Sequence, residues 1–208
     1  TAGSVDIIRR AKKRGVNVTA EVTPHHLLLT EELVRGYDPR FKVNPPLRRD
    51  EDVQAVREGL ADGTIDIVAT DHAPHPDESK SCEWQAAANG MVGLESALRV
   101  VQQAVVDTGL LDWNDVARVM SSAPARIGRL DRAGTPLEAG APASFTLYDP
   151  RAARPFTRAD LRGRSVNSPY LGRDLPGDVR WTFFGGRPTV ADGVLAETMS
   201  AANTEVPA

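Results

Sequence analysis

The feature that most constrains the fold is an alternation of helix-like and strand-like patterns along residues 4–133. The helix-like stretches repeat apolar side chains at helical spacing, and the strand-like stretches are short runs bounded by Gly, Pro or Asp. We expect helices at residues 4–14, 50–60, 90–106 and 113–120, and strands at residues 16–22, 41–48 and 65–69. Elements that alternate in this order are typical of parallel βαβ units, so the sequence predicts an α/β fold.

The predicted strand at residues 65–69 is followed at once by Thr70-Asp71-His72-Ala73-Pro74-His75. In α/β folds, ligand-binding and catalytic groups lie beyond the carboxyl ends of parallel strands. Asp71 therefore has the chemistry and the position of a metal ligand or a general base. The alternative is an aspartate that caps the next turn, with a surface histidine beside it.

Other polar residues also follow strand-like runs. The four histidines of the chain come in two such groups, namely His25 with His26 and His72 with His75. Asn44 precedes Pro45, which favours an extended backbone at Asn44 and lets its side chain point at a ligand, although a plain turn would use the same residues. Residues 76–89 are polar and irregular, which is typical of a binding loop or a lid over substrate.

Composition changes at Gly134, after which Pro and Gly are frequent and the strand-like runs are short. We therefore predict three parts, residues 1–133 as the α/β part, 134–194 as a small β segment and 195–208 as a tail. In the β segment we expect strands at residues 143–148, 179–184 and 188–190, with a turn at Gly185-Gly186.

Charge and composition exclude several classes of protein. The net charge of −3 gives no reason to propose nucleic-acid binding or an anionic membrane surface. No apolar run approaches the ~18 residues of a membrane-spanning helix, so none is expected. The single Cys82 excludes an internal disulfide and fits a reducing compartment, so we expect a cytoplasmic location.

Seven motifs, in order, resemble those of bacterial dihydroorotases of the first class, members of the cyclic amidohydrolase superfamily. They lie at residues 23–27, 42–48, 70–75, 90–95, 122–126, 134–140 and 167–170. The resemblance implies a (β/α)8 barrel of the TIM type with a small β appendage, of which this chain would hold the C-terminal part. It also implies zinc-dependent, reversible cyclisation of N-carbamoyl-L-aspartate to dihydroorotate in pyrimidine biosynthesis.

The resemblance assigns roles residue by residue. Asp71 matches the metal-ligating aspartate that also carries the proton. Asn44 and His75 match substrate contacts, and Asn89 and Gly90 match a loop pair that touches the substrate. Asn89 replaces an aromatic residue that is usual there, so only a backbone contact carries over to it.

The remaining motif histidines receive lesser expectations. His25 and His26 are expected to be structural or to support the site from behind, and His72 is given no direct role. The family's other metal ligands are a His-x-His pair, an acidic or modified-lysine ligand and two single histidines, and this sequence has none of them. One of those histidines belongs to a His-x-Ser-Thr motif, and Thr1 follows where that motif would be.

We therefore interpret the chain as the C-terminal half of a dihydroorotase. One or two zinc ions would take most of their ligands from the N-terminal half, which becomes the expected partner. A small-molecule substrate, further copies of the same protein and another pyrimidine enzyme are the other expected partners. The alternatives are an allantoinase or hydantoinase, or a silent structural homologue. Asn44 and the Asp71-to-His75 spacing favour dihydroorotate.

Overall fold

The structure, a computed structural model, describes residues 1–196 and divides the chain into two compact units. The first unit contains residues 1–135 and 154–176, and the second begins at residue 136, leaves at 153 and resumes at 177. The change of unit after residue 135 lies beside the predicted boundary near Gly134, and the division into three parts stays a prediction. The predicted β segment, however, is interrupted, because residues 154–176 return to the first unit. Most of the predicted tail lies outside the described residues.

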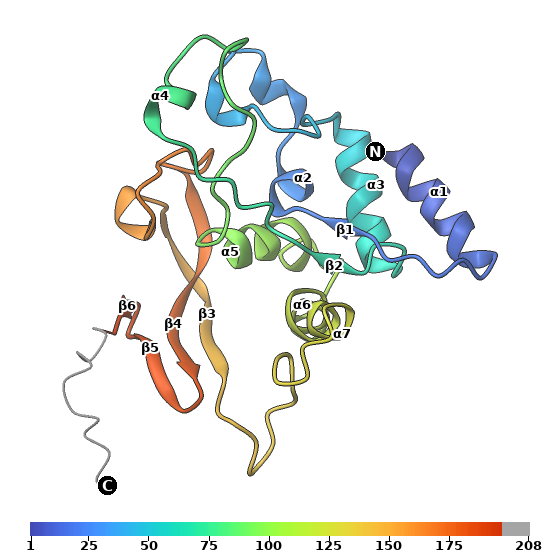
Figure 1. The fold of residues 1–208 in the computed structure, drawn as a ribbon, viewed down its shortest axis with the longest axis vertical. Helices are drawn as coiled ribbons and strands as arrows, with labels where there is room; N and C mark the ends of the chain where they lie inside the picture. The colour runs from blue at the N-terminus through green and yellow to red at the C-terminus, as the bar shows by residue number, and fades with distance from the viewer. Residues whose placement is uncertain (197–208) are drawn as a thin grey trace, which may run out of the picture. The chain divides into compact units, whose positions relative to one another are not determined.

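The first unit is mainly helical and surrounds a short parallel strand pair (Figure 1). Its α-helices are α1 (Ala2–Lys13), α2 (Pro24–Leu28), α3 (Asp50–Ala61), α4 (Asp77–Lys80), α5 (Ala97–Val101), α6 (Trp113–Ala117) and α7 (Ala123–Ile127). Single 3₁₀ turns cover Glu31–Val34, Pro39–Phe41 and Arg158–Asp160, and π-helical turns cover Gln102–Val106 and Arg118–Ser122. No helix among the described residues is long and apolar enough to cross a membrane.

The strand pair consists of β1 (Glu21–Val22) and β2 (Ile67–Val68), which run parallel with Glu21 opposite Ile67. Helix α3 lies between them in the chain, so the predicted βαβ order is confirmed. Both strands are shorter than predicted. Among residues 1–196 each of them has a strand neighbour on one side alone, so no second ladder extends the pairing.

Two apolar clusters form the interior of the first unit. One joins α1, the strand pair and α3 to the segment that follows α5, and its most buried members are Leu27, Leu60, Val101, Ala104, Val105 and Val119. The other includes Met91 and Val100 together with Phe156, Leu161, Tyr170 and Leu175. These last four residues explain why residues 154–176 belong to the first unit, since burying such apolar side chains is the main stabilising term in folding.

Arg99 adds a polar tie to the same segment. Its side chain is buried and donates hydrogen bonds to the backbone carbonyls of Arg154 at 2.7 Å and Leu175 at 2.5 Å. It also donates to the Pro176 carbonyl at 3.2 Å. The two ends of residues 154–176 are therefore held by one guanidinium on α5.

The second unit contains most of a four-stranded sheet in the order β3-β4-β5-β6. Its strands are β3 (Phe145–Pro155), β4 (Asp174–Phe184), β5 (Arg187–Ala191) and β6 (Val194–Leu195). Strand β4 pairs antiparallel with β5 across the predicted Gly185-Gly186 turn, and both glycines have positive φ. The three predicted strands are confirmed, whereas β6 was not predicted.

Two predicted elements of the first unit were wrong. Helical structure predicted from residue 90 begins at Ala97, and Leu94, inside the predicted helix, is 59% exposed. Gly93 explains part of this, because its backbone passes Thr70 so closely that a Cβ would lie 3.3 Å from the Thr70 carbonyl oxygen. Residues 41–48 form no strand either. Pro45 and Pro46 have no N–H to donate to a ladder, and Arg48 forms a single bridge with Thr30.

Candidate active site

Asp71 stands three residues beyond the end of β2, in the left-handed backbone region with φ 48°. Aspartate and asparagine are the residues other than glycine that tolerate this conformation best. The Asp71 side chain is exposed and has no hydrogen-bond or ion-pair partner among residues 1–196. The carboxylate is therefore available to an external ligand, and the reading of Asp71 as a turn cap finds no hydrogen bond to support it.

Asp71 shares a cavity of about 520 Å³ with Asn44. His26, Thr23 and Arg48 supply further polar groups to the cavity wall. The apolar part of the wall consists of Val22, Val53, Val56, Pro45 and Pro46. The structure thus brings together two of the predicted site residues that are 27 positions apart in sequence.

His26 braces the turn that carries Asn44. Its Nε2 lies 3.0 Å from the Pro45 carbonyl, and its Nδ1 lies 2.7 Å from the Thr23 hydroxyl. A carbonyl can only accept, so Nε2 carries the proton and Nδ1 accepts from Thr23. Both ring nitrogens are therefore engaged within the chain, which leaves His26 poorly placed to bind a metal.

His25 lies deeper, with 2% of its surface exposed and its ring centroid 4.6 Å from that of His26. Its Nε2 has no hydrogen-bond partner in the described part of the chain. Burial, followed by the neighbouring His26, lowers the pKa of His25 to about 3, so its ring is neutral near pH 7.

A second group of predicted residues assembles around Gly90. The His75 Nε2 donates to the Asn89 backbone carbonyl at 2.8 Å. Gly90 has φ 126°, and a Cβ on it would lie 2.6 Å from the Ala73 Cβ and 3.0 Å from the His75 Nε2. Only glycine allows the backbone to pass this close to Ala73 and His75. The backbone of residues 89–90 and the His75 ring are therefore packed together. The His75 Nδ1 is the ring nitrogen left over for a ligand.

His72 has a definite structural contact. Its Nδ1 accepts hydrogen bonds from the backbone N–H groups of Gly93 at 3.1 Å and Leu94 at 3.3 Å. Nδ1 is therefore unprotonated, and the ring proton is on Nε2. A parallel bridge between His72 and Met91 extends the same contact. His72 thus anchors residues 91–94 beside the end of β2.

Two lysines hold the loop predicted at residues 76–89. The Lys42 ammonium donates to the carbonyls of Trp84, Gln85 and Ala87 at 2.6–3.1 Å. The Lys80 ammonium donates to the carbonyls of Ala88 and Gly90, both at 2.9 Å, and to that of Lys42 at 3.3 Å. The loop is thus folded onto the unit without a ligand, and its closure over substrate stays a prediction.

Lys80 is 5% exposed, and burial, with the Lys42 charge as the next cause, lowers its pKa to about 8. Sequence reasoning missed both lysines. Lys42 lies in the motif at residues 42–48. No sequence pattern around Lys42 or Lys80 indicates that their ammonium groups bind backbone carbonyls.

A metal site can be completed only in part from this chain. Among residues 1–196, no three His, Cys, Asp or Glu side chains are grouped closely enough to hold an ion. Asp71 fits one position of a zinc site, because its carboxylate is free and faces the cavity. Glu21 and Asp52 also line this cavity, but within residues 1–196 they complete no group of three ligands with Asp71.

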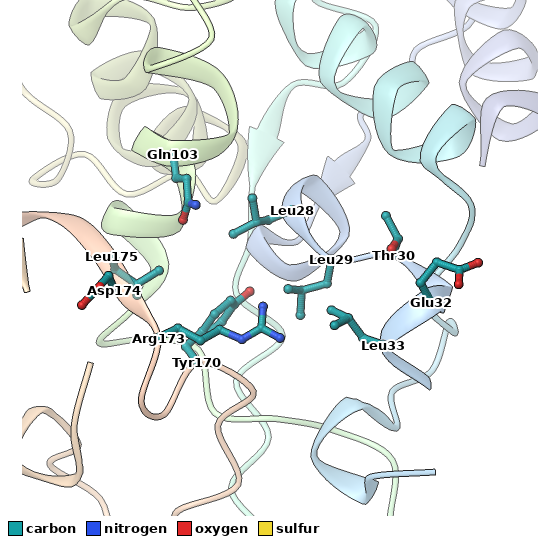
Figure 2. Close-up of a pocket in the computed structure, with 10 residues that line it drawn as sticks. All are labelled: Leu28, Leu29, Thr30, Glu32, Leu33, Gln103, Tyr170, Arg173, Asp174 and Leu175. Atoms are coloured by element: carbon teal, nitrogen blue, oxygen red, sulfur yellow. The ribbon is translucent and has the colours of Figure 1, made fainter. Parts of the chain in front are cut away.

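A separate cavity of about 250 Å³ lies between α2, the turn at Glu31–Val34 and residues 170–175 (Figure 2). The Tyr170 hydroxyl and the Gln103 Oε1 are buried in this region and have no hydrogen-bond partner within residues 1–196. None of the predicted site residues lines this cavity. It is therefore distinct from the cavity of Asn44 and Asp71.

A parallel βαβ pair with a free carboxylate beyond the strand end, in one cavity with an asparagine, is typical of part of a (β/α) barrel. Residues 2–189 match the amidohydrolase family, and the chain belongs to that family. The predicted fold class is confirmed by solved structures that share this fold. An L-hydantoinase (dihydropyrimidinase) from Arthrobacter aurescens is 28% identical, with a TM-score of 0.83 over 94% of this chain and 44% of its own.

A D-hydantoinase (dihydropyrimidinase) from Thermus sp. is 25% identical, with a TM-score of 0.81 over 92% of this chain and 43% of its own. Curated proteins that are similar in sequence are named dihydroorotases instead. A dihydroorotase of Leifsonia xyli is 69% identical over 97% of this chain and 46% of its own length. A dihydroorotase of Streptomyces coelicolor is 62% identical over 94% and 46%. The predicted resemblance to dihydroorotases is thus confirmed, and the chain spans about half the length of these relatives.

Proposed function

We propose that the chain is the C-terminal part of a dihydroorotase, which catalyses the reversible cyclisation of N-carbamoyl-L-aspartate to dihydroorotate. The observation that carries this proposal is the free Asp71 carboxylate in one cavity with Asn44, and the contact that joins His75 to residues 89–90 supports it. The high identity to proteins named dihydroorotase supports it. The other metal ligands would come from an N-terminal half, in keeping with relatives about twice as long.

In the hydrolytic direction Asp71 is the general base. It removes a proton from the water that attacks the ring carbonyl carbon, and it returns that proton to the ring nitrogen as the C–N bond breaks. Bound zinc would polarise the carbonyl and lower the pKa of the water. Asp71 suits both proton transfers because its oxygens form no competing hydrogen bonds within the described chain. Cyclisation follows the same steps in reverse.

The substrate carboxylate, which hydantoin and allantoin lack, calls for a donor or a positive charge in a partly dry site. His75 is the candidate, and its Nε2 is already used by the Asn89 carbonyl. The Nδ1 therefore makes the contact, and it donates when the ring carries a second proton. Asn44 contributes an uncharged amide, and residues 89–90 contribute backbone groups.

The proposal is tested on the full-length protein that carries this chain. Purified with zinc, it should hydrolyse dihydroorotate and form it from N-carbamoyl-L-aspartate. Both directions are measured by the ultraviolet absorbance of the ring. Dihydrouracil and hydantoin, assayed in parallel, should react far more slowly.

Preference for the uncharged rings would reject the proposal. It would favour the second candidate, a hydantoinase-type cyclic amide hydrolase, which the structural neighbours support. Failure to turn over any of these rings with zinc bound would point to a silent homologue.

A further inference from the structure

The Asn167 side chain joins the two segments that carry the proposed substrate contacts. Its Oδ1 accepts a hydrogen bond from the His75 backbone N–H at 3.3 Å. Its Nδ2 donates to the Ala73 carbonyl at 2.9 Å and to the Gly90 carbonyl at 3.3 Å. One carboxamide therefore ties the turn after Asp71 to the segment that begins at Asn89.

The three partners select an amide side chain. They are one N–H group and two carbonyls, so the residue between them has to accept once and donate twice. A carboxamide has this set of groups, with the donors on one arm and the acceptor on the other. A carboxylate of the same shape could serve His75 but would place an oxygen against two carbonyl oxygens. An apolar side chain would leave all three groups unpaired.

Asn167 is itself held in place. Its side chain is buried, with 4% of the residue exposed, and its own backbone carbonyl accepts from the Val92 N–H at 3.1 Å. The Gly90 carbonyl receives a second hydrogen bond from Lys80 at 2.9 Å. The His75 ring in turn donates to the Asn89 carbonyl. The contacts form a closed ring through Asn167, Gly90, Asn89 and His75.

We propose that Asn167 is a positioning residue for the substrate, because it fixes the His75 ring and the backbone of residues 89–90 relative to each other. This inference rests on the proposed dihydroorotase function and adds a residue that touches neither the substrate nor Asp71. Asn167 makes no contact with the Asp71 side chain, so its loss should weaken substrate binding more than it slows the chemical step.

The test measures steady-state kinetics of the full-length, zinc-loaded protein. For Asn167→Ala we expect KM for dihydroorotate to rise about tenfold, the scale of one lost hydrogen bond, while kcat changes by less than about threefold. For Asn167→Asp, which keeps the shape, we expect a larger rise, because the carboxylate repels the two carbonyls. A residue that only fills space would tolerate Asp and leave KM unchanged.

The matched control is Ser168→Ala. Ser168 is fully buried beside Asn167 and accepts a hydrogen bond from the Tyr170 N–H at 3.3 Å, but it contacts neither His75 nor Gly90. Its variant is expected to lose some stability while KM stays within about twofold of the wild type. Zinc content should be equal in all three variants, because the metal ligand Asp71 is untouched.

A KM within about twofold of wild type for both Asn167 variants would overturn the inference. Inactivity of the wild type would reject the proposed function instead. Amide hydrogen exchange would then test separately whether Asn167 holds the His75 backbone. The His75 N–H is bonded to Asn167 Oδ1, so its exchange should be slow in the wild type and about tenfold faster in Asn167→Ala. Equal exchange would overturn the tie itself. If the Ala variant fails to fold, the isosteric Asp variant decides through KM, and Asn167→Leu, which keeps the volume but has no acceptor, takes its place in the exchange measurement.

Discussion

Replacing Asp71 with asparagine separates its chemical role from its structural one. The residue has φ 48°, a conformation that costs most L-residues about 1–2 kcal/mol. Asparagine tolerates it as aspartate does, and no hydrogen bond within the described chain is lost. We therefore expect the unfolding free energy of Asp71→Asn to stay within about 0.5 kcal/mol of wild type. Asp71→Ala should be less stable by about 1 kcal/mol, because alanine has no side-chain group to support the left-handed backbone.

The effect on catalysis should be far larger. General base catalysis contributes about 10²–10⁴-fold, and the amide is also a poorer metal ligand, so Asp71→Asn should lose at least 100-fold in kcat/KM in both directions. The measurements are dihydroorotate hydrolysis and synthesis with zinc supplied, urea unfolding, and metal content by mass spectrometry. Asp77→Asn is the control, since Asp77 is an exposed aspartate six residues further along the chain, on α4. More than about a tenth of wild-type kcat/KM in the Asp71→Asn enzyme would refute the role.

Three further predictions follow from the same contacts. Gly90→Ala should raise KM and lower stability, because a Cβ would lie 2.6 Å from the Ala73 Cβ and 3.0 Å from the His75 ring; unchanged kinetics would contradict this. The pKa of His25 is lowered from 6.5 to about 3, so the folded state binds fewer protons between these values and stability falls as pH drops through them. Between pH 7 and pH 5 the unfolding free energy measured with urea should therefore fall by about 2 kcal/mol. His25→Leu should abolish this loss. A folded state with a charged His25 ring would show no such loss. Lys80→Met should remove one hydrogen-bond donor from each of three carbonyls and speed chymotrypsin cleavage after Trp84, and unchanged cleavage would show that the loop is held by other means.

The features that were predictable from sequence are those with a local cause. Glycines and prolines mark where β2 begins and where the turn after it ends, so Asp71 and His75 could be placed at a strand end. The Gly185-Gly186 turn between β4 and β5 was equally clear, because both residues take φ values that favour glycine.

The features that escaped prediction depend on distant residues. The spacing of apolar residues after Gly90 fits a helix, but Gly93 is packed against Thr70 and His72 binds the following N–H groups. The return of residues 154–176 to the first unit depends on Phe156 and Arg99, whose partners no local pattern reveals. Periodicity reports a local preference, and here tertiary contacts override it.

The Asn167 tie also has a consequence for the order in which the protein folds. Its hydrogen bonds span 92 residues to His75 and 94 to Ala73, so closing them costs more loop entropy than local contacts do. A ribosome adds about 5–20 residues per second, which places Asn167 roughly 5–20 s behind His75 as the chain emerges. The strand pair and its helices can form during that interval, but the substrate contacts acquire their geometry last. A nascent chain halted before residue 167 would have every residue of the first apolar cluster, but it would lack Tyr170 and Leu175 of the second cluster and would have an unfinished binding site.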